Sequence, residues 1–556
     1  MKYPKNELAQ LVIASLVSQN LEDVIVSPGS RNAPLTIGLT SHPKINTYSI
    51  VDERCAAFVA LGMAQQKQKP VALLCTSGSA LLNYYPAIAE AFYSEIPLVV
   101  LSADRPEHYV DIGDGQTIRQ KNVFENHSLF NANLREGAFS SNKEKLESAL
   151  SKAYSGKGPV HINIPFEEPL YDTVPTILEL ESKAPSNSND LFLNAIPLDV
   201  DLLQGHADVW NQASKKIVLV GAHYPDELLQ IQLQHFSKDP SVLVFLETTS
   251  NATDPCFING IDQLLFPLKD EELEQLKPDI LVTLGGMVVS KKIKQFFRKH
   301  RPDAHWHIDP IKSMDTFQCL TQHFKKTPQL FLSQFFFLTQ PVASSYQKEW
   351  LQIKRRRKQR HAVFLEKVIF SDFKAHELIY ATLPKNIHLQ LGNSSVVRYA
   401  QFFEMQPSWR IFCNRGTSGI EGSTSTAIGA AMATEIPTVF ITGDLSFFYD
   451  SNALWNAYVP NSFRIVLINN NGGGIFKVIP GPSSSEVLDY FETPHGLNAA
   501  QLCEMHGFAY QKTSDEQHLK SCLQAFYQVS NQPKLLEITT PSAENDLVLK
   551  AYFKEL

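Results

Sequence analysis

The segment from residue 437 to residue 476 constrains the fold most, because two apolar runs in it each end in a polar loop. Residues 437–442 read as a buried strand, and Asp444 follows where that strand should end. A helical pattern over residues 446–458 leads to a second apparent strand, 464–468, and then to an Asn-Asn-Asn-Gly-Gly-Gly loop. These polar groups should meet in the crevice where open α/β sheets bind ligands. Carboxylate, amide and carbonyl oxygens suit Mg²⁺, which usually shares its shell with water and phosphates.

This pattern resembles the diphosphate-binding motif of thiamine diphosphate enzymes, in which Gly-Asp-Gly precedes Asn-Asn by about two dozen residues. Here 24 residues, 446–469, separate Leu445 from Asn470, and Leu445 replaces the third residue of the motif, a glycine. The resemblance implies that Asp444, Asn470 and the carbonyl group of Gly472 bind the metal ion.

Two alternatives remain open at this motif. The three consecutive asparagines also permit a shift of register, in which Asn471 and Gly473 supply the ligands. An Asn/Gly turn that merely closes a strand, with Asp444 as the N-cap of a helix, would produce a similar pattern.

A glutamate near the N-terminus matches the second element of thiamine enzymes, a carboxyl group facing N1′ of the aminopyrimidine ring. Residues 48–51 read as a short strand and a helix should begin at Glu53, so Glu53 also lies at a ligand-binding edge. An acid in a first helical turn is common without any such role, because the helix dipole stabilises it. The surrounding motifs favour the catalytic interpretation.

Short motifs of distinctive composition follow one another along nearly the whole chain. They are Ser27-Pro-Gly-Ser-Arg31, Asp52-Glu-Arg54, Thr76-Ser-Gly-Ser-Ala80, Ala103-Asp-Arg-Pro106, Gln116-Thr-Ile118, Gly392-Asn-Ser394, Asn414-Arg-Gly416, Ser418-Gly-Ile420, Gly443-Asp-Leu-Ser446 and Asn471-Gly-Gly-Gly-Ile-Phe476. This ordered series resembles the 2-succinyl-5-enolpyruvyl-6-hydroxy-3-cyclohexene-1-carboxylate (SEPHCHC) synthase family of menaquinone biosynthesis. The resemblance rests on the order of the whole series rather than on any single motif.

The resemblance implies a thiamine diphosphate-dependent transferase that uses Mg²⁺ or Mn²⁺. Glu53 would be the catalytic group, since it favours the imino tautomer of the cofactor's aminopyrimidine, and Ile420 would wedge between the two cofactor rings. Helix N-terminal amides near Leu445 and Ser446 would bind diphosphate oxygens. The residues implied to bind the cofactor are Pro28, Glu53, Thr76, Asn83, Ser418, Ile420, Gly443, Asp444, Leu445, Ser446, Asn470, Gly472, Gly473 and Ile475.

The family reaction joins two acidic substrates: 2-oxoglutarate loses CO₂, and the resulting succinyl carbanion equivalent adds to isochorismate. Arginine suits their carboxylates, because its planar fork binds a carboxylate bidentately. The residues implied to bind substrate are Ser30, Arg31, Arg105, Gln116, Lys291, Lys292, Ser394, Arg398, Arg415, Ile475 and Phe476. Lys292 stands where an arginine is frequent, and Gly115 where an asparagine is common, so the detailed substrate contacts stay open.

Some of these residues, and the chain itself, have other interpretations. Outside its motif Arg31 reads as a surface residue, and Lys291 with Lys292 as an exposed helix face. An acetolactate synthase-like carboligase or 2-oxoacid decarboxylase would keep Glu53 and the metal motif without needing all four arginines. A non-catalytic binding subunit should have lost Glu53 or a metal ligand, and this chain keeps them.

The composition indicates a globular protein, with 44% hydrophobic and 19% charged residues. Its net charge of −7 gives no electrostatic reason to expect nucleic acid as a partner. No apolar run approaches a membrane span, and the first residues lack the apolar core of a signal peptide. The seven dispersed cysteines favour buried thiols over a disulfide framework. A cytoplasmic enzyme acting on small molecules is expected.

Alternating strand and helix patterns predict an α/β fold of three domains, with mostly parallel sheets covered by helices. The 556 residues would divide into a pyrimidine-binding domain (1–180), a central domain (195–340) and a diphosphate- and Mg-binding domain (360–556). A polar linker is expected at 181–190, and the charged run 354–360 is interpreted as a solvated helix face. In the superfamily, the pyrimidine-binding domain of one chain faces the diphosphate-binding domain of another, which implies a homodimer or homotetramer.

Overall fold

The computed structural model describes residues 2–181, 199–478, 481 and 485–556, and the expected linker lies outside them except for residue 181. The chain forms two compact units. The first comprises residues 1–190, 414–438 and 446–463, and the second comprises residues 191–413, 439–445 and 464–556.

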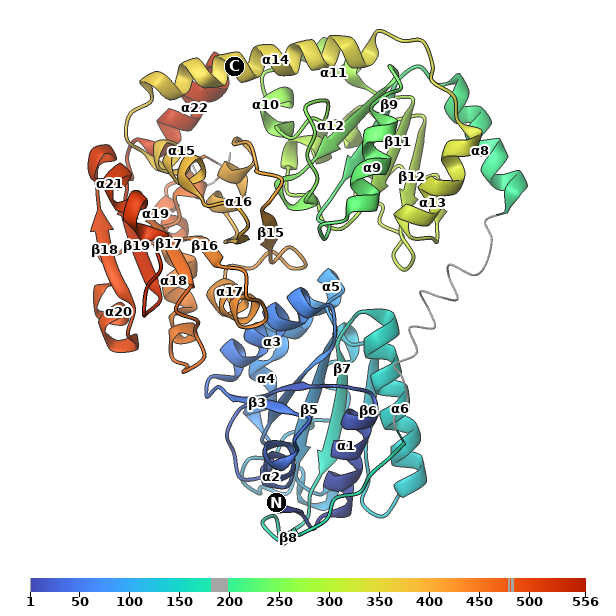
Figure 1. Ribbon diagram of the computed structural model, residues 1–556, viewed down its shortest axis with the longest axis vertical. Coiled ribbons are helices and arrows are strands. Elements are labelled where there is room, and N and C mark those ends of the chain that lie inside the picture. Colours follow the sequence, from blue (N-terminus) through green and yellow to red (C-terminus); the bar gives the residue numbers. More distant parts are fainter. Residues whose placement is uncertain (1, 182–198, 479–480, 482–484) are drawn as a thin grey trace. The chain divides into compact units, whose positions relative to one another are not determined.

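The first unit contains a six-stranded parallel sheet of order β3-β2-β4-β5-β7-β6 (Figure 1). Its strands are β2 (Asp23–Val26), β3 (Asn46–Ser49), β4 (Val71–Cys75), β5 (Leu98–Asp104), β6 (Phe130–Asn133) and β7 (Val160–Pro165). Its helices are α1 (Glu7–Ser18), α2 (Ala33–Ser41), α3 (Glu53–Lys67), α4 (Ser79–Asn83), α5 (Tyr85–Ser94) and α6 (Phe139–Gly156). Strands β1 (Tyr3–Pro4) and β8 (Thr173–Val174) pair with each other and form a separate two-stranded antiparallel sheet. Strands β4 and β5 are buried at every position, as expected for a parallel sheet covered on both faces.

A segment from much later in the chain completes the first unit. Helix α17 (Ser423–Met432) packs against α3 so closely that only glycine fits at two contact positions. A Cβ atom on Gly62 would lie 2.0 Å from the carbonyl oxygen of Thr426, and one on Gly429 would lie 2.0 Å from that of Val59. The two backbones therefore touch without intervening side chains.

The second unit holds two parallel sheets, of which the first has the order β10-β9-β11-β12-β13. Its strands are β9 (Lys216–Val220), β10 (Val242–Leu246), β11 (Ile280–Leu284), β12 (Ala304–Ile308) and β13 (Gln322–Phe324). The accompanying helices are α8 (Val200–Gln212), α9 (Glu227–Phe236), α10 (Ile261–Leu265), α11 (Asp270–Leu276), α12 (Lys291–Lys299) and α13 (Pro328–Phe335). Alternate residues of β9 enter two different hydrophobic cores, Val218 with Trp306 on one face and Leu219 with Phe297 on the other.

The other sheet of the second unit has the order β15-β14-β16-β17-β19-β18. Its strands are β14 (His388–Leu391), β15 (Arg410–Cys413), β16 (Thr438–Gly443), β17 (Arg464–Asn469), β18 (Ala509–Thr513) and β19 (Lys534–Thr539). The helices around it are α15 (Asp372–Thr382), α16 (Ser395–Ala400), α19 (Leu488–Glu492), α20 (Ala500–His506), α21 (Glu516–Phe526) and α22 (Asn545–Glu555). Helix α18 (Asp444–Tyr449) follows β16, and its residues from Ser446 onward belong to the first unit. Parallel pairing places Gly443 of β16 opposite Ile468 of β17, so the loops after both strands leave the sheet at one edge.

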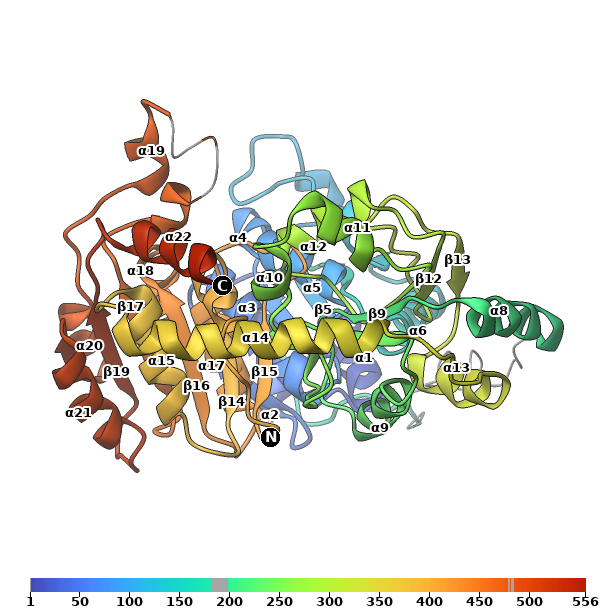
Figure 2. The ribbon, with the colours of Figure 1, turned by 90° about the horizontal axis from the view of Figure 1, so that it is seen from above.

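Helix α14 (Tyr346–Lys367) runs along the second unit and contacts both α10 and α22 (Figures 1 and 2). The prediction of a solvated face over residues 354–360 is partly wrong. Arg357 is buried, and Lys354 donates hydrogen bonds to the carbonyl oxygens of Pro255 and Phe257. Among the described residues, no helix combines the length and apolar character that crossing a bilayer requires.

The predicted α/β class is confirmed, with three parallel sheets flanked by helices. The helix expected over residues 446–458 is wrong in its bounds: α18 ends at Tyr449, and a 3₁₀ turn follows at Ser451–Leu454. The chain leaves the helix where the side chain of Asp450 binds the backbone N–H of Ser425 at 2.8 Å. The strand expected at 48–51 is β3 and ends two residues earlier, at Ser49.

Gly62→Ala should lower the free energy of unfolding by about 1–3 kcal/mol, because the added methyl group would overpack the contact between α3 and α17. Gly205→Ala is the matched control, since a Cβ atom there meets nothing within 4 Å. In the interior of α8 this control should be neutral or stabilising by up to about 1 kcal/mol. Denaturant titrations followed by circular dichroism compare the variants. A Gly62→Ala protein as stable as its parent would contradict the close helix contact.

Candidate functional site

Asp444 joins the two loops of the proposed diphosphate-binding motif, the one after residue 443 and the Asn-Gly loop at residues 469–474. Its Oδ1 accepts the backbone N–H of Leu445 at 2.7 Å, and its Oδ2 accepts that of Gly472 at 2.9 Å. Nε2 of His495 lies 3.3 Å from the same Oδ2. Burial raises the pKa of Asp444, while the N–H groups of Gly472 and Leu445 and the nearby His495 oppose that rise. The carboxylate therefore does more than cap a helix, because it fixes a loop from the neighbouring strand.

Asn470 presents a buried amide oxygen to this cluster. Its Nδ2 donates to Oδ2 of Asp372 at 2.8 Å, whereas its Oδ1 has no hydrogen-bond partner among the described residues. Burial raises the pKa of Asp372 to about 6. Asn471 differs, since it is exposed and has a φ of +68°. A buried polar atom without a partner costs free energy and points to an absent ligand or water.

The glycine loop after Asn471 is held by the backbone of α19. Gly472 has a φ of +145°, and a Cβ atom on it would lie 2.6 Å from the carbonyl oxygen of Glu492. The same carbonyl accepts the N–H of Gly473 at 2.6 Å, and the carbonyl of Gly472 accepts the N–H of Gly474 at 2.9 Å. A 3₁₀ turn, Gly474–Lys477, then carries Ile475 and Phe476, which are both partly exposed.

The donor set at this edge fits a hard divalent cation. Within the described ranges there is no group of three or more His, Cys, Asp or Glu side chains suited to a metal ion. The available ligands are instead the carboxylate of Asp444, the amide oxygen of Asn470 and the carbonyl of Gly472. Such oxygen ligands suit Mg²⁺ or Mn²⁺ rather than a metal that prefers sulfur.

In the first unit, Glu53 is the first residue of α3, as predicted. The N-cap is its neighbour Asp52, whose carboxylate accepts the N–H of Cys55 at 3.1 Å. Glu53 is thus not the capping group. Its Oε2 accepts a hydrogen bond from Nδ2 of Asn83 at 3.4 Å, which brings two of the predicted cofactor residues together.

The loop carrying Pro28, Ser30 and Arg31 lies against Thr76. The backbone N–H of Arg31 donates to Oγ1 of Thr76 at 3.3 Å, while Pro28 and Ser30 remain exposed. Arg31 as a residue is only 5% exposed, and its guanidinium already donates a hydrogen bond to the carbonyl oxygen of Phe166 at 2.9 Å. Its Nε has no partner within the described part of the chain.

Gln116 and Arg105 lie on the segment that follows β5. Gln116 is exposed with a φ of +54°, and its backbone lies against Gly78. The guanidinium of Arg105 is 3.7 Å from the carboxylate of Asp114. The buried side chain of Gln120 accepts the N–H of Gly78 at 2.8 Å and so ties this segment to the loop after β4.

A buried acid, Glu90 of α5, positions the loop from Arg415 to Ser418. Its two oxygens accept the N–H of Gly416 at 2.7 Å and the N–H of Thr417 at 2.6 Å. Farther along, the hydroxyl of Ser446 donates to the carbonyl oxygen of Ile420 at 2.6 Å, and Ile420 is partly exposed.

The predicted residues are divided between the two units. The first unit holds Pro28, Ser30, Arg31, Glu53, Thr76, Asn83, Arg105, Gln116, Arg415, Ser418, Ile420 and Ser446. The second unit holds Lys291, Lys292, Ser394, Arg398, Gly443, Asp444, Leu445, Asn470, Gly472, Gly473, Ile475 and Phe476. Sequence reasoning missed Asp372, His495 and Glu90, because nothing in their local patterns indicates their distant partners.

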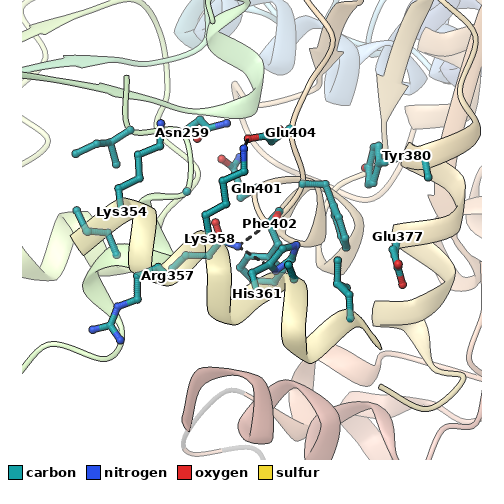
Figure 3. Close-up of a pocket in the computed structure, with 18 of the residues that line it drawn as sticks. Asn259, Lys354, Arg357, Lys358, His361, Glu377, Tyr380, Gln401, Phe402 and Glu404 are labelled. Atoms are coloured by element: carbon teal, nitrogen blue, oxygen red, sulfur yellow. Dashed lines mark hydrogen bonds and ion pairs between the residues drawn. The ribbon is translucent and has the colours of Figure 1, made fainter. Parts of the chain in front are cut away.

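A cavity of about 400 Å³ in the second unit lies between α10, α14, α15 and the segment after α16 (Figure 3). Lys358, His361, Tyr380, Gln401 and Phe402 are among the residues that line it. None of the predicted site residues contributes to its wall.

Comparisons with known proteins define the class. Residues 6–128 match the family model "Thiamine pyrophosphate enzyme, N-terminal TPP binding domain", and residues 391–538 match "Thiamine pyrophosphate enzyme, C-terminal TPP binding domain". The fold and these matches make the protein a thiamine diphosphate-dependent enzyme, which removes the non-catalytic alternative.

Full-length relatives narrow the class to a family. The chain is 51% identical over 558 residues to the SEPHCHC synthase of Flavobacterium johnsoniae, with 100% of both chains covered. It is 50% identical over 565 residues to that of Flavobacterium psychrophilum, again with 100% of both covered. The Porphyromonas gingivalis synthase is 37% identical over 559 residues, covering 96% of this chain and 94% of that relative. The chain belongs to the 2-succinyl-5-enolpyruvyl-6-hydroxy-3-cyclohexene-1-carboxylate synthase family.

Asp450, which anchors α17, should make stability depend on pH. Burial raises its pKa from 3.8 to about 6, so the folded protein binds a proton more tightly than the unfolded chain. Its contribution to stability is then complete below about pH 4 and is lost as the pH rises through about 6.

Asp450→Asn should remove about 2–3 kcal/mol of the difference in unfolding free energy between pH 4 and pH 7. Denaturant titrations at both pH values measure this difference. Glu144→Gln, at an exposed acid on α6, is the control and should keep the parental difference. An Asp450→Asn variant with the parental difference would contradict the assignment.

Proposed function

We propose that the protein catalyses the decarboxylation of 2-oxoglutarate and the conjugate addition of the resulting succinyl carbanion equivalent to isochorismate. The products would be SEPHCHC and CO₂, in menaquinone biosynthesis. The observation that carries this proposal is the 51% identity, over the full length of both chains, to a synthase named for that product. The retained cofactor and substrate motifs support it.

Mg²⁺ or Mn²⁺ would be held by Asp444, Asn470 and the carbonyl oxygen of Gly472, against the cofactor diphosphate. The buried Oδ1 of Asn470, which lacks a partner among the described residues, supports this register. The shifted register through Asn471 and Gly473 has less support, because Asn471 is exposed. Gly443, Leu445 and Ser446 would line the diphosphate with backbone and hydroxyl groups.

Thiamine diphosphate, when bound, supplies a nucleophilic carbon and an electron sink for decarboxylation. The chain's own contribution begins at Glu53, whose carboxyl group would hold a proton against N1′ of the pyrimidine. Asn83, at 3.4 Å, would orient that carboxyl group. Pro28, Thr76, Ser418, Ile420 and Ile475 would complete the cofactor contacts, Ile420 as the apolar wedge between the rings.

The substrates carry two carboxylates each, so cations should surround them. Arg31, Arg105, Arg398 and Arg415 would bind carboxylates with their planar forks, and Lys291 and Lys292 would add positive charge. Ser30, Gln116 and Ser394 would be polar partners, while Ile475 and Phe476 would form an apolar wall.

The proposal also covers the oligomeric state of the active enzyme. Glu53 and Asp444 lie in different proposed domains, 1–180 and 360–556, on either side of a central domain, 195–340. A homodimer would be the smallest active unit, and dimers would pair into a tetramer if a second interface exists. Sedimentation of the active species tests this point, and an active monomer would contradict it.

The decisive assay combines the purified protein with thiamine diphosphate, Mg²⁺, 2-oxoglutarate and isochorismate. Isochorismate consumption coupled to CO₂ release should require every component. Glu53→Gln should reduce the rate by about 10²–10⁴-fold, because it removes the acid–base group. Glu144→Gln, at an exposed acid on α6, is the control and should retain full activity.

The other outcomes of this assay are equally informative. If the rate of CO₂ release does not depend on isochorismate but increases with pyruvate or an aldehyde, the protein would be an acetolactate synthase-type enzyme instead. A protein that turns over neither acid would overturn the proposed reaction. Full activity in Glu53→Gln would overturn the role of Glu53 alone.

A further inference from the structure

The Asp-Glu-Arg motif at residues 52–54 contains an arginine that the proposed function does not use. Arg54 is the second residue of α3, at the end of the helix that carries partial positive charge, where a cation is disfavoured. Its side chain is also largely withdrawn from solvent, with 22% exposed. Local preferences are commonly broken at functional sites, where the surrounding structure compensates. The partners of Arg54 explain why a cation is tolerated there.

Arg54 binds the C-terminal end of α18, whose last residue is Tyr449. Its Nη2 donates a hydrogen bond to the carbonyl oxygen of Tyr449 at 2.8 Å. Carbonyl groups in the last turn of a helix lack partners within the helix and carry partial negative charge, so a guanidinium is favoured there. The Cζ atom of Arg54 also lies 4.8 Å from the ring centroid of Tyr449, which adds a cation–π attraction. Arg54 therefore closes the end of one helix from the first turn of another.

The next residue, Asp450, adds a fully buried carboxylate to this cluster. Its Oδ1 lies 3.9 Å from Nη2 of Arg54. The same oxygen accepts the thiol of Cys55 at 3.7 Å and the hydroxyl of Ser425 at 3.0 Å. Several donors around one carboxylate offset the cost of burying it. The two residues that follow Glu53 are thus both tied to Asp450.

The residue that precedes Glu53 is held by the same part of the chain. Nδ2 of Asn452, in the 3₁₀ turn after α18, donates to Oδ2 of Asp52 at 2.8 Å. The other oxygen of Asp52 accepts the N–H of Cys55 and caps α3. Asn452 therefore orients the capping group of the helix that Glu53 begins.

The strand that leads to Glu53 contacts this segment as well. The hydroxyl of Tyr458 accepts the N–H of Ser49, the last residue of β3, at 2.9 Å. The rings of Tyr48 and Tyr458 meet edge to face, with their centroids 5.3 Å apart. All of these contacts lie within the first unit. Residues on both sides of Glu53 are consequently bound by residues 449–458.

We propose that Arg54 is a positioning residue, which fixes the first turn of α3 so that the carboxyl group of Glu53 meets the aminopyrimidine ring of thiamine diphosphate in one orientation. The inference rests on the role proposed for Glu53. The hydrogen bond that Glu53 accepts from Asn83 is long, at 3.4 Å, so the backbone that carries Glu53 must supply most of its orientation. A purely structural Arg54 would only stabilise the contact between α3 and α18.

Deuterium exchange at C2 of bound thiamine diphosphate tests this role without any substrate, because the exchange reports the proton transfer that Glu53 is proposed to promote. In Arg54→Ala the exchange rate should fall about tenfold or more, since small misplacements of a catalytic group are costly. Arg54→Lys keeps the charge and one donor for the Tyr449 carbonyl, so it should give an intermediate rate. Arg135→Ala, at an exposed arginine outside every motif, is the matched control and should keep the parental rate.

Three further measurements separate positioning from a loss of stability. In a Glu53→Gln background, Arg54→Ala should slow the exchange by less than about twofold further, because it acts through Glu53. Asn452→Ala removes an exposed side chain, so it should keep the parental thermal stability and still slow the exchange. In the cofactor-free protein, amide hydrogen exchange should accelerate at the start of α3 in Arg54→Ala and stay parental in α6.

A parental C2 exchange rate in Arg54→Ala, or full additivity with Glu53→Gln, would overturn the inference. If Arg54→Ala does not fold, Arg54→Lys decides: a rate below parental supports the inference, and a parental rate overturns it. A parental rate in Glu53→Gln would overturn the role of Glu53 and this inference with it.

Failure of the proposed reaction would look different. A parent protein that exchanges the C2 proton but turns over neither 2-oxoglutarate nor isochorismate would refute that reaction alone. The comparison of Arg54→Ala with Arg135→Ala would still decide the positioning role, because it uses only thiamine diphosphate and Mg²⁺.

Discussion

The hydrogen bond from the N–H of Gly472 to Oδ2 of Asp444 is the interaction on which the proposed cofactor-binding edge of the second unit depends. It exists because β16 and β17 are parallel neighbours in a register that places Gly443 opposite Ile468. The polar loops after both strands consequently leave at one edge, and a single carboxylate can bind both. Two residues before Gly472, the amide oxygen of Asn470 is buried without a hydrogen-bond partner among the described residues, and we propose it as a ligand of the divalent cation.

Other buried acids also hold loops in place by accepting hydrogen bonds from backbone N–H groups. Glu90 fixes the loop at Gly416 and Thr417, and Glu247 fixes the segment that leads into α12. Each accepts two backbone N–H groups that the regular elements leave unpaired. Such charge-assisted hydrogen bonds offset the cost of burying a carboxylate. Loops that carry polar site residues are thereby made rigid without long secondary-structure elements.

The sequence predicted the strands at 437–442 and 464–468, which are β16 and β17 in the structure, because buried parallel strands are continuous apolar runs. It also predicted that Glu53 begins a helix and that Asp444 follows a strand. It could not predict that α18 stops at Tyr449, since the contact of Asp450 with Ser425 depends on tertiary packing. The role of Glu90 could not be predicted either, because its hydrogen-bond partner Gly416 lies 326 residues away in the sequence. The roles of the individual site residues remain predictions that rest on family resemblance.

The most direct test of the account is a crystal structure of the protein with thiamine diphosphate and Mn²⁺, with the metal located by its anomalous scattering. The account predicts one strong peak within bonding distance of the Asp444 carboxylate, Oδ1 of Asn470 and the Gly472 carbonyl, next to the diphosphate. A peak bound by Asn471 and Gly473 would establish the shifted register. A peak away from Asp444, or a cofactor bound elsewhere, would contradict the central claim.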